Sequence, residues 1–268
     1  MAERLWVVRD GTTIADVERD DGRLELRFRP EVVARSNGAA LLSVSLPVRA
    51  TPYAEAELLP FLAGLLPEGI VRERLARRFR LNVSDVFGFL RAIGRDSAGA
   101  LSIVEEGTDL EAERNAGIEW LNDEQLAQRV AELGTRPLAD EPAAGIRISL
   151  AGVQDKMALV VQGDRIGLPH GTSPSTHILK PASVERRGGR GDKLAYPSLV
   201  ANEAFCTVLA AQANLRAASV EMRQVGGEAA LLVARYDRAV TGTEVTRIHQ
   251  EDLCQALGIA PDLKYEAD

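Results

Sequence analysis

The sequence predicts an α+β fold built from a β-rich N-terminal subdomain and a second part in which short strands surround one long helix. Three observations predict it. Strand-like alternation of apolar and polar residues dominates the first 50 positions, helix-like spacing follows up to position 93, and strand-like runs return after position 145. We therefore expect a subdomain over residues 1–104, an acidic linker with one helix over 105–145, and a mixed part over 146–268.

The composition excludes several classes of protein. Of the 268 residues, 46% are hydrophobic and 26% are charged, which is typical of a soluble globular chain. The net charge of −7 gives no indication of nucleic-acid binding over the whole surface. No apolar run is long enough to cross a membrane, and 3 histidines with 2 separated cysteines predict no metal site. We expect a cytoplasmic protein with reduced cysteines.

The N-terminal subdomain begins with a predicted hairpin. Asp10-Gly11 is a two-residue turn signal between strand-like runs at 5–9 and 12–17. The other predicted strands of this subdomain are 24–28, 41–46 and 100–104. Its predicted helices are 54–65, 70–79 and 85–93.

The mixed part has an informative order of elements. Its predicted strands are 146–150, 157–162, 165–168, 177–180, 220–225 and 229–236, with a long helix over 198–215 and a last helix from about residue 250. A loop between two strands, a third strand ending in lysine, a helix and two more strands is the order found in the nucleotide-holding N-lobe of protein kinases. The sequence thus predicts a kinase-like N-lobe.

The loop and the lysine are weak signals when each is taken alone. Small residues at 151–156 let backbone N–H groups approach phosphate oxygens, but one glycine is far short of a GxGxxG motif, and an ordinary hairpin loop explains it better. Lys180 could reach ATP phosphates from the end of its strand. A solvent-exposed lysine at a strand end is the simpler interpretation of that residue.

Glu203 is a stronger signal because it is the only charged side chain between Leu199 and Leu215. A helix that is apolar nearly all round is expected to be buried on several sides. A buried carboxylate needs a partner, and Lys180 is the natural candidate, as in the lysine–glutamate ion pair of kinases. Alternatively, Glu203 lies on a solvated strip beside Asn202.

The strand end at Ala234, Arg235 and Tyr236 is where a kinase hinge would offer backbone groups to adenine, with an aromatic ring against the base. The alternative is an ordinary aromatic residue at a strand end.

Several strings, in order along the chain, resemble the HipA family of toxin kinases. In the mixed part they are 148–156 (ISLAGVQDK), 176–180 (THILK), 202–203 (NE), 233–238 (VARYDR) and 250–255 (QEDLCQ). Before it, 46–47 (LP), 65–68 (LLPE) and 93–100 (IGRDSAGA) are similar to the N-terminal subdomain of that family. The resemblance spans essentially the whole chain.

The resemblance implies a serine/threonine protein kinase of a toxin–antitoxin pair that uses ATP and Mg²⁺. It implies a HipB-like helix-turn-helix antitoxin as partner, contact with DNA only through that antitoxin, and an aminoacyl-tRNA synthetase as the type of substrate. By this likeness Ser149 is the autophosphorylated serine and Lys180 the ATP-contacting lysine. The implied phosphate loop is Ala151, Gly152, Val153, Gln154, Asp155 and Lys156, and the implied adenine hinge is Ala234, Arg235 and Tyr236.

The chain departs from the family pattern in two places. Ala234 stands where the family usually has glutamate, and no segment after Tyr236 resembles the Asp-Gly-His-x-Lys-Asn catalytic loop. We expect no catalytic residue and no helical C-terminal lobe within these residues, exposed apolar surface at Leu253 and Leu257, and no kinase activity of this chain alone. The alternative function is a non-catalytic interaction module that binds an antitoxin or a separate catalytic chain.

Overall fold

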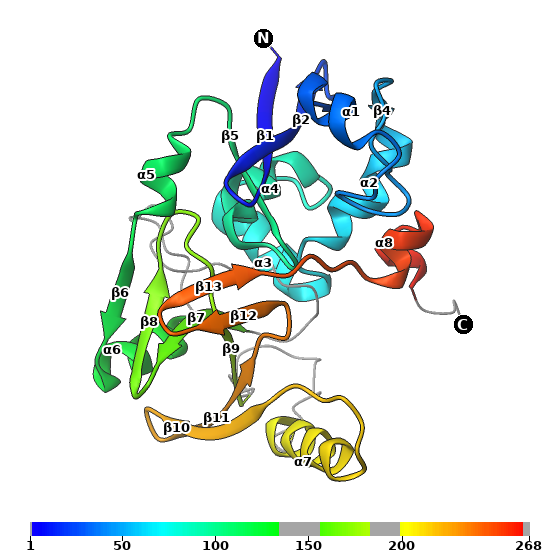
Figure 1. Cartoon of the computed structure of the whole chain (residues 1–268). Helices are drawn as coiled ribbons and strands as arrows, with labels where there is room; N and C mark the ends of the chain where they lie inside the picture. The colour runs from blue at the N-terminus through cyan, green and yellow to red at the C-terminus, as the bar shows by residue number, and fades with distance from the viewer. Residues whose placement is uncertain (1, 134–155, 183–198, 265–268) are drawn as a thin grey trace, which may run out of the picture.

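The computed structural model describes residues 2–133, 156–182 and 199–264. In these residues the chain forms a five-stranded sheet, a six-stranded sheet and a two-stranded sheet, together with helices (Figure 1). The mixed helix-and-sheet class predicted from the sequence is confirmed. No helix in the described part of the chain is both long and apolar enough to span a membrane.

The N-terminal sheet is antiparallel, with strand order β4-β3-β2-β1-β5. Its strands are β1 (Glu3–Arg9), β2 (Thr12–Asp20), β3 (Arg23–Phe28), β4 (Tyr53–Ala54) and β5 (Leu101–Glu105). The β1–β2 turn has positive φ at Asp10 (50°) and Gly11 (76°). Such turns match the twist of the paired strands, so this Asp-Gly pair sets the hairpin register.

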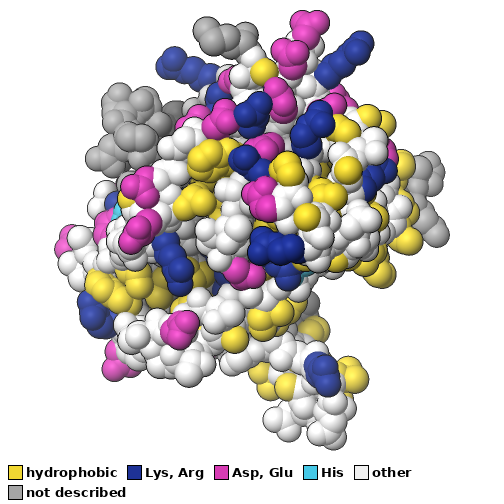
Figure 2. All heavy atoms as spheres, turned by 45° about the horizontal axis from the view of Figure 1, so that its top comes forward, with side chains coloured by type: hydrophobic (Ala, Val, Ile, Leu, Met, Phe, Trp, Pro, Cys, Tyr) yellow, Lys and Arg dark blue, Asp and Glu magenta, His cyan; other side chains and the backbone are white. Residues whose placement is uncertain are grey.

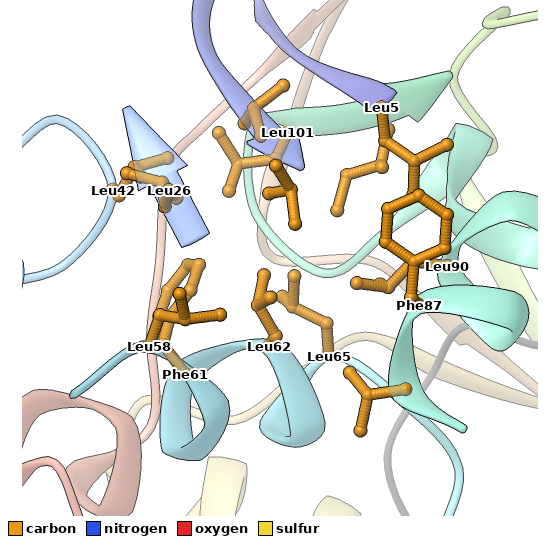
Figure 3. Close-up of a cluster of buried hydrophobic side chains, with 14 of the residues drawn as sticks. Leu5, Leu26, Leu42, Leu58, Phe61, Leu62, Leu65, Phe87, Leu90 and Leu101 are labelled. Carbon is orange, nitrogen blue, oxygen red and sulfur yellow. The ribbon is translucent and has the colours of Figure 1, made fainter. Parts of the chain in front are cut away.

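Helices pack on this sheet and enclose the main hydrophobic core. They are α1 (Pro30–Ser36), α2 (Glu55–Gly64), α3 (Gly69–Phe79) and α4 (Val86–Ile93). Leu26 of β3, Phe61 and Leu62 of α2, and Leu90 of α4 are each at most 1% exposed and meet between sheet and helices (Figure 3). Alternate residues of each strand point to this core, as the period-two pattern predicts.

The N-terminal part differs from the prediction in two places. The predicted strand at 41–46 is a loop with a single bridge between Ser43 and Leu46. Its apolar residues Leu42 and Leu46 are fully buried. The apolar pattern therefore reflects a buried loop and not a strand paired by hydrogen bonds. Helix α1 was not predicted. It has proline at its first position, where the missing N–H costs nothing.

The acidic segment after β5 is more structured than a linker with one helix. It contains α5 (Leu110–Arg114), β6 (Ile118–Leu121) and α6 (Asp123–Glu132). Strand β6 pairs with β8 at the edge of the second sheet. The indole of Trp120 also packs against the Arg165 guanidinium, 4.0 Å from the ring centroid. A four-residue strand within an acidic segment is too short for its sequence pattern to predict it.

The second sheet is antiparallel, with order β10-β11-β9-β7-β8-β6. Its strands in the mixed part are β7 (Met157–Gln162), β8 (Arg165–Pro169), β9 (His177–Pro181), β10 (Val220–Val225) and β11 (Glu228–Ala234). The strand predicted at 146–150 lies outside the described residues. Helix α7 (Leu199–Gln212) lies beside β10 and β11 at the far end of the molecule from the N-terminal sheet (Figure 1).

The expectation that α7 is buried on several sides was wrong. Val200 is its buried residue, whereas Phe205 is 66% exposed and Leu209 is 55% exposed. Only one stripe of the helix contacts the sheet, and the described residues do not cover its outer face. The predicted exposure of Leu253 (80%) and Leu257 (69%) is confirmed.

After β11 the chain returns to the N-terminal part. It forms the hairpin β12 (Arg238–Thr241) and β13 (Glu244–Arg247), which was not predicted, and then α8 (Leu253–Leu257). The buried Gln255 amide donates to the Phe61 carbonyl of α2 at 2.9 Å. At Gly64 a side-chain Cβ would lie 2.7 Å from Gln255 Cγ, so only glycine leaves room there. This contact fixes α8 on α2.

Acidic and basic side chains are interspersed on the face shown in Figure 2.

Candidate functional site

The structure brings two lysines and one glutamate together at one end of the second sheet. Strands β7 and β9 pair with Met157 opposite Leu179, so the next residues along the two strands, Lys156 and Lys180, are neighbours. Lys180 Nζ donates to Glu203 Oε1 of α7, which is the partner that the composition of the helix indicates. The side chains of Lys180 and Glu203 are 20% and 29% exposed, so the pair is partly open to solvent.

This cluster has an excess of positive charge. Lys156 is 8% exposed. Burial, and then the neighbouring Lys180 charge, lower the pKa of Lys156 to about 8, while the Glu203 carboxylate opposes this shift. At neutral pH Lys156 is still mostly protonated, and its charged surroundings are the ammonium groups of Lys180 and Lys264 and the carboxylates of Glu203 and Glu68, so three positive charges meet two negative ones. A bound polyanion would compensate the excess charge, and lysine ammonium groups are suited to phosphate.

The predicted phosphate loop cannot be placed next to these lysines in full. Ser149 and the loop residues Ala151, Gly152, Val153, Gln154 and Asp155 lie outside the described residues. Lys156, the last residue of that loop, is described and lies immediately before β7, beside Lys180.

The predicted hinge lies on the strand that pairs with β9. Ala234 faces His177, and Lys180 faces Leu231, so both features share the β9–β11 pair. The N–H groups of Ala234 and Arg235 donate to Ser219 O (2.8 Å) and Thr176 O (2.9 Å).

Among the backbone N–H groups of Ala234, Arg235 and Tyr236, the N–H of Tyr236 is the one that has no acceptor among the described residues. Tyr236 is 71% exposed, and its hydroxyl contacts Gln250 Oε1. The Arg235 side chain points inward, where it is 1% exposed. Of the three hinge residues, Tyr236 is therefore the one that is mostly exposed and whose N–H has no acceptor in the described part of the chain.

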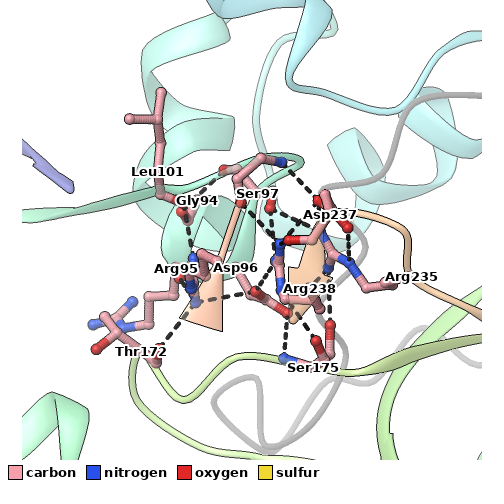
Figure 4. Close-up of polar contacts among 12 residues, drawn as sticks. Gly94, Arg95, Asp96, Ser97, Leu101, Thr172, Ser175, Arg235, Asp237 and Arg238 are labelled. Carbon is pink, nitrogen blue, oxygen red and sulfur yellow. Dashed lines mark hydrogen bonds and ion pairs between the residues drawn. The ribbon is translucent and has the colours of Figure 1, made fainter. Parts of the chain in front are cut away.

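A buried network of charged side chains, which the sequence reasoning missed, lies next to this hinge (Figure 4). Asp96, in the loop after α4, accepts from Arg238 (2.9 Å), Arg247 (3.0 Å) and Arg235 (3.4 Å). Asp237 accepts from Arg235 at 2.7 Å and from Arg238 at 2.9 Å. Three arginines thus share two carboxylates.

The arginines in this network stay charged because their remaining donors also find acceptors. Arg238 donates to the carbonyls of Ser175 (3.1 Å) and Gly99 (2.9 Å). Burial lowers the pKa of Arg238 to about 10, although Asp96 opposes the shift. Burial alone would raise the pKa of Asp237, but the hydrogen bond and charge of Arg235 outweigh it, and this pKa lies below its ordinary value.

No metal site is visible in the part of the chain that the structure describes. There, no three histidine, cysteine, aspartate or glutamate side chains cluster as metal ligands. Glu203 is already paired with Lys180. The described residues therefore fit the phosphates of a nucleotide and do not fit a Mg²⁺ ion, so no chemical step is assigned to a metal.

Comparison with protein families supports the resemblance of both parts. Residues 5–104 match a family model described as the HipA N-terminal domain, and residues 148–268 match one described as the HipA-like C-terminal domain.

Individual relatives agree with the family models. The chain is 38% identical over 231 residues to the putative kinase Y4mE of Sinorhizobium fredii, covering 85% of this chain and 52% of that relative. It is 32% identical over 227 residues to the serine/threonine-protein kinase toxin HipA of Shewanella oneidensis, covering 84% and 48%. The chain spans about half the length of these curated relatives.

A solved structure shares the fold. It belongs to the Shewanella oneidensis complex of the toxin–antitoxin proteins HipA and HipB with operator DNA. It matches with a TM-score of 0.76 at 27% sequence identity, covering 98% of this chain and 58% of that one.

Proposed function

The chain belongs to the HipA family, and we propose that it forms the nucleotide-holding half of a serine/threonine kinase toxin. The observation that carries the proposal is the ion pair between Lys180 on β9 and Glu203 on the helix that follows. A lysine on the third strand of an antiparallel sheet, paired with a glutamate of the next helix, is the arrangement by which protein kinases hold ATP phosphates.

The two ends of the nucleotide take different groups. Lys156 and Lys180 contact the phosphates as point charges, and the loop of Ala151 to Asp155 covers them with backbone N–H groups. The adenine ring lies at Tyr236, whose N–H has no partner among the described residues and which is largely exposed. Ala234 offers no side-chain acceptor, so backbone bonds and stacking carry recognition of the base.

The partner and the substrate are proposed from the relatives. One relative was solved with HipB and operator DNA. We propose a HipB-like helix-turn-helix antitoxin as partner of this chain, with DNA reached through it, and a translation factor such as an aminoacyl-tRNA synthetase as substrate. ATP and Mg²⁺ are the proposed cofactors of the kinase. The domain boundaries at residues 104 and 145 remain proposals.

The first test separates nucleotide binding from phosphate transfer. The 268-residue chain is expected to bind ATP in calorimetry and to incorporate no phosphate from labelled ATP into a serine peptide, because phosphoryl transfer needs a positioned aspartate and metal ligands. Absence of ATP binding by the wild-type chain would refute the proposed function, and phosphate transfer would refute its inactivity.

Ser149→Asp is expected to weaken ATP binding in the same calorimetric series, because it adds about −1 charge beside the proposed place of the phosphates.

The affinity for ATP is expected to fall as the pH rises above 8. The pKa of Lys156 is about 8 in the free protein, and a bound triphosphate raises it because it stabilises the ammonium form. Binding therefore takes up a proton in alkaline solution, and affinity at pH 9 should be up to about tenfold weaker than at pH 7. Calorimetry across this range checks it, and Lys156→Met should flatten the profile. An equally steep profile in that variant would contradict the assignment.

A further inference from the structure

The segment that carries the proposed adenine end is held by the N-terminal part of the chain. Asp96 accepts from Arg238 at 2.9 Å and from Arg235 at 3.4 Å. In the same loop, Gly99 N–H donates to Asp237 Oδ2 at 2.8 Å. Residues on both sides of the exposed Tyr236 are thus held by the segment that precedes β5 in the N-terminal part, and Figure 4 shows Asp96 beside Arg235, Asp237 and Arg238.

The backbone of the segment is fixed at the same points. Arg235 N–H donates to Thr176 O of the chain just before β9, and Asp237 O accepts from Ile248 N–H, both at 2.9 Å. Arg235 and Arg238 have side chains that are 1% and 0% exposed. Buried guanidinium groups need carboxylate partners, so loss of the Asp96 charge would push these side chains toward water and shift the backbone between them.

We propose that Asp96 is a positioning residue of the nucleotide site, which acts through Arg235 and Arg238 to fix the backbone of Tyr236 at the adenine end. The inference rests on the proposed function, but it concerns the adenine end alone. The proposed phosphate end is at Lys156, just before β7, and at Lys180 on β9, and neither residue is among the charged side chains that form this network.

The test compares two ligands on the full chain. Asp96→Asn keeps the shape of the side chain and removes its charge. ATP should bind about tenfold more weakly to this variant. This change corresponds to the loss of one well-aligned hydrogen bond between the adenine and the backbone at Tyr236. Inorganic tripolyphosphate, which lacks the base, should bind within about twofold of wild type, because distant sites act independently. A role in stability alone would weaken both ligands equally.

A matched control comes from the same subdomain. Asp16 is 15% exposed in its side chain and pairs with Arg29 at 2.7 Å, away from the network. Asp16→Asn should leave both affinities unchanged. If Asp96→Asn does not fold, Ser175→Ala replaces it, because this variant removes only the hydroxyl that accepts from Arg235 at 2.9 Å. It should show the same selective loss to a smaller extent.

The outcomes separate this inference from the proposed function. Equal loss of ATP and tripolyphosphate, or no loss of either, overturns the inference. If the wild-type chain binds neither ligand, the proposed function fails, and hydrogen exchange then decides the role of Asp96. Faster exchange of the Arg235 and Ile248 amides in Asp96→Asn, with unchanged rates in Asp16→Asn, would show that Asp96 fixes the backbone beside Tyr236, and unchanged rates in both variants overturn the inference.

Discussion

Replacing Arg238 by methionine is expected to lower the free energy of unfolding by about 3–5 kcal/mol, the usual cost of breaking a buried ion pair. The Arg238 side chain is fully buried and lies between Asp96 and Asp237, each 2.9 Å away. Methionine has a similar length but no charge, so both carboxylates lose a partner and the carbonyls of Ser175 and Gly99 lose their donor. Urea denaturation at neutral pH measures the loss. The slope m of the unfolding free energy against urea concentration should be the same in both proteins, which shows that the unfolded state is unchanged.

Arg27→Met is the control for this loss of stability. Arg27 pairs with Glu25 at 2.6 Å on the surface, and its side chain is 56% exposed. Exposed pairs contribute little, so this variant should lie within about 0.5 kcal/mol of wild type. A loss below about 1 kcal/mol in Arg238→Met would show that the remaining arginines compensate both carboxylates, contrary to our account of the network.

The predictable parts of the fold are those whose signals are local. The β1–β2 turn was readable because Asp10-Gly11 adopts positive φ, which few other residues accept. Strand β6 and the hairpin of β12 and β13 were missed. Each of these strands has four residues, and their stability comes from contacts with distant segments rather than from their own pattern.

The candidate site divides in the same way. Lys180 and Glu203 could be paired from the sequence because a single charge in an apolar helix needs a partner, although the helix itself is far more exposed than its composition suggests. Asp96 and Arg235 are 139 residues apart. Nothing local selects Asp96 from the 39 acidic residues of the chain. Only the crowding of Arg235, Asp237 and Arg238 into four positions hinted at a buried charge cluster.

Replacing Lys180 by methionine is expected to weaken ATP binding about 10- to 100-fold, which corresponds to the loss of hydrogen bonds from a charged donor to phosphate. The variant also leaves the Glu203 carboxylate without its partner, next to the place proposed for the phosphates. Calorimetry with a non-hydrolysable ATP analogue measures the effect. Arg27→Met is the control, because Arg27 pairs with Glu25 on the exposed surface of the N-terminal sheet, at 2.6 Å, and lies on neither strand of the site. Unchanged affinity in Lys180→Met would remove this lysine from the site.

Glu203→Gln decides what the glutamate does for this lysine. If Glu203 orients the ammonium group, the variant binds ATP several-fold more weakly, and adding it to Lys180→Met has no further effect, since the two residues act as one unit. If Glu203 only neutralises Lys180, removing its negative charge strengthens ATP binding. The partly exposed ion pair on β9 favours the first result, because a flexible lysine stem loses much of its rotamer freedom when a carboxylate holds it in place. Tighter binding in Glu203→Gln would contradict the orienting role and leave Lys180 as the sole determinant of phosphate affinity in this pair.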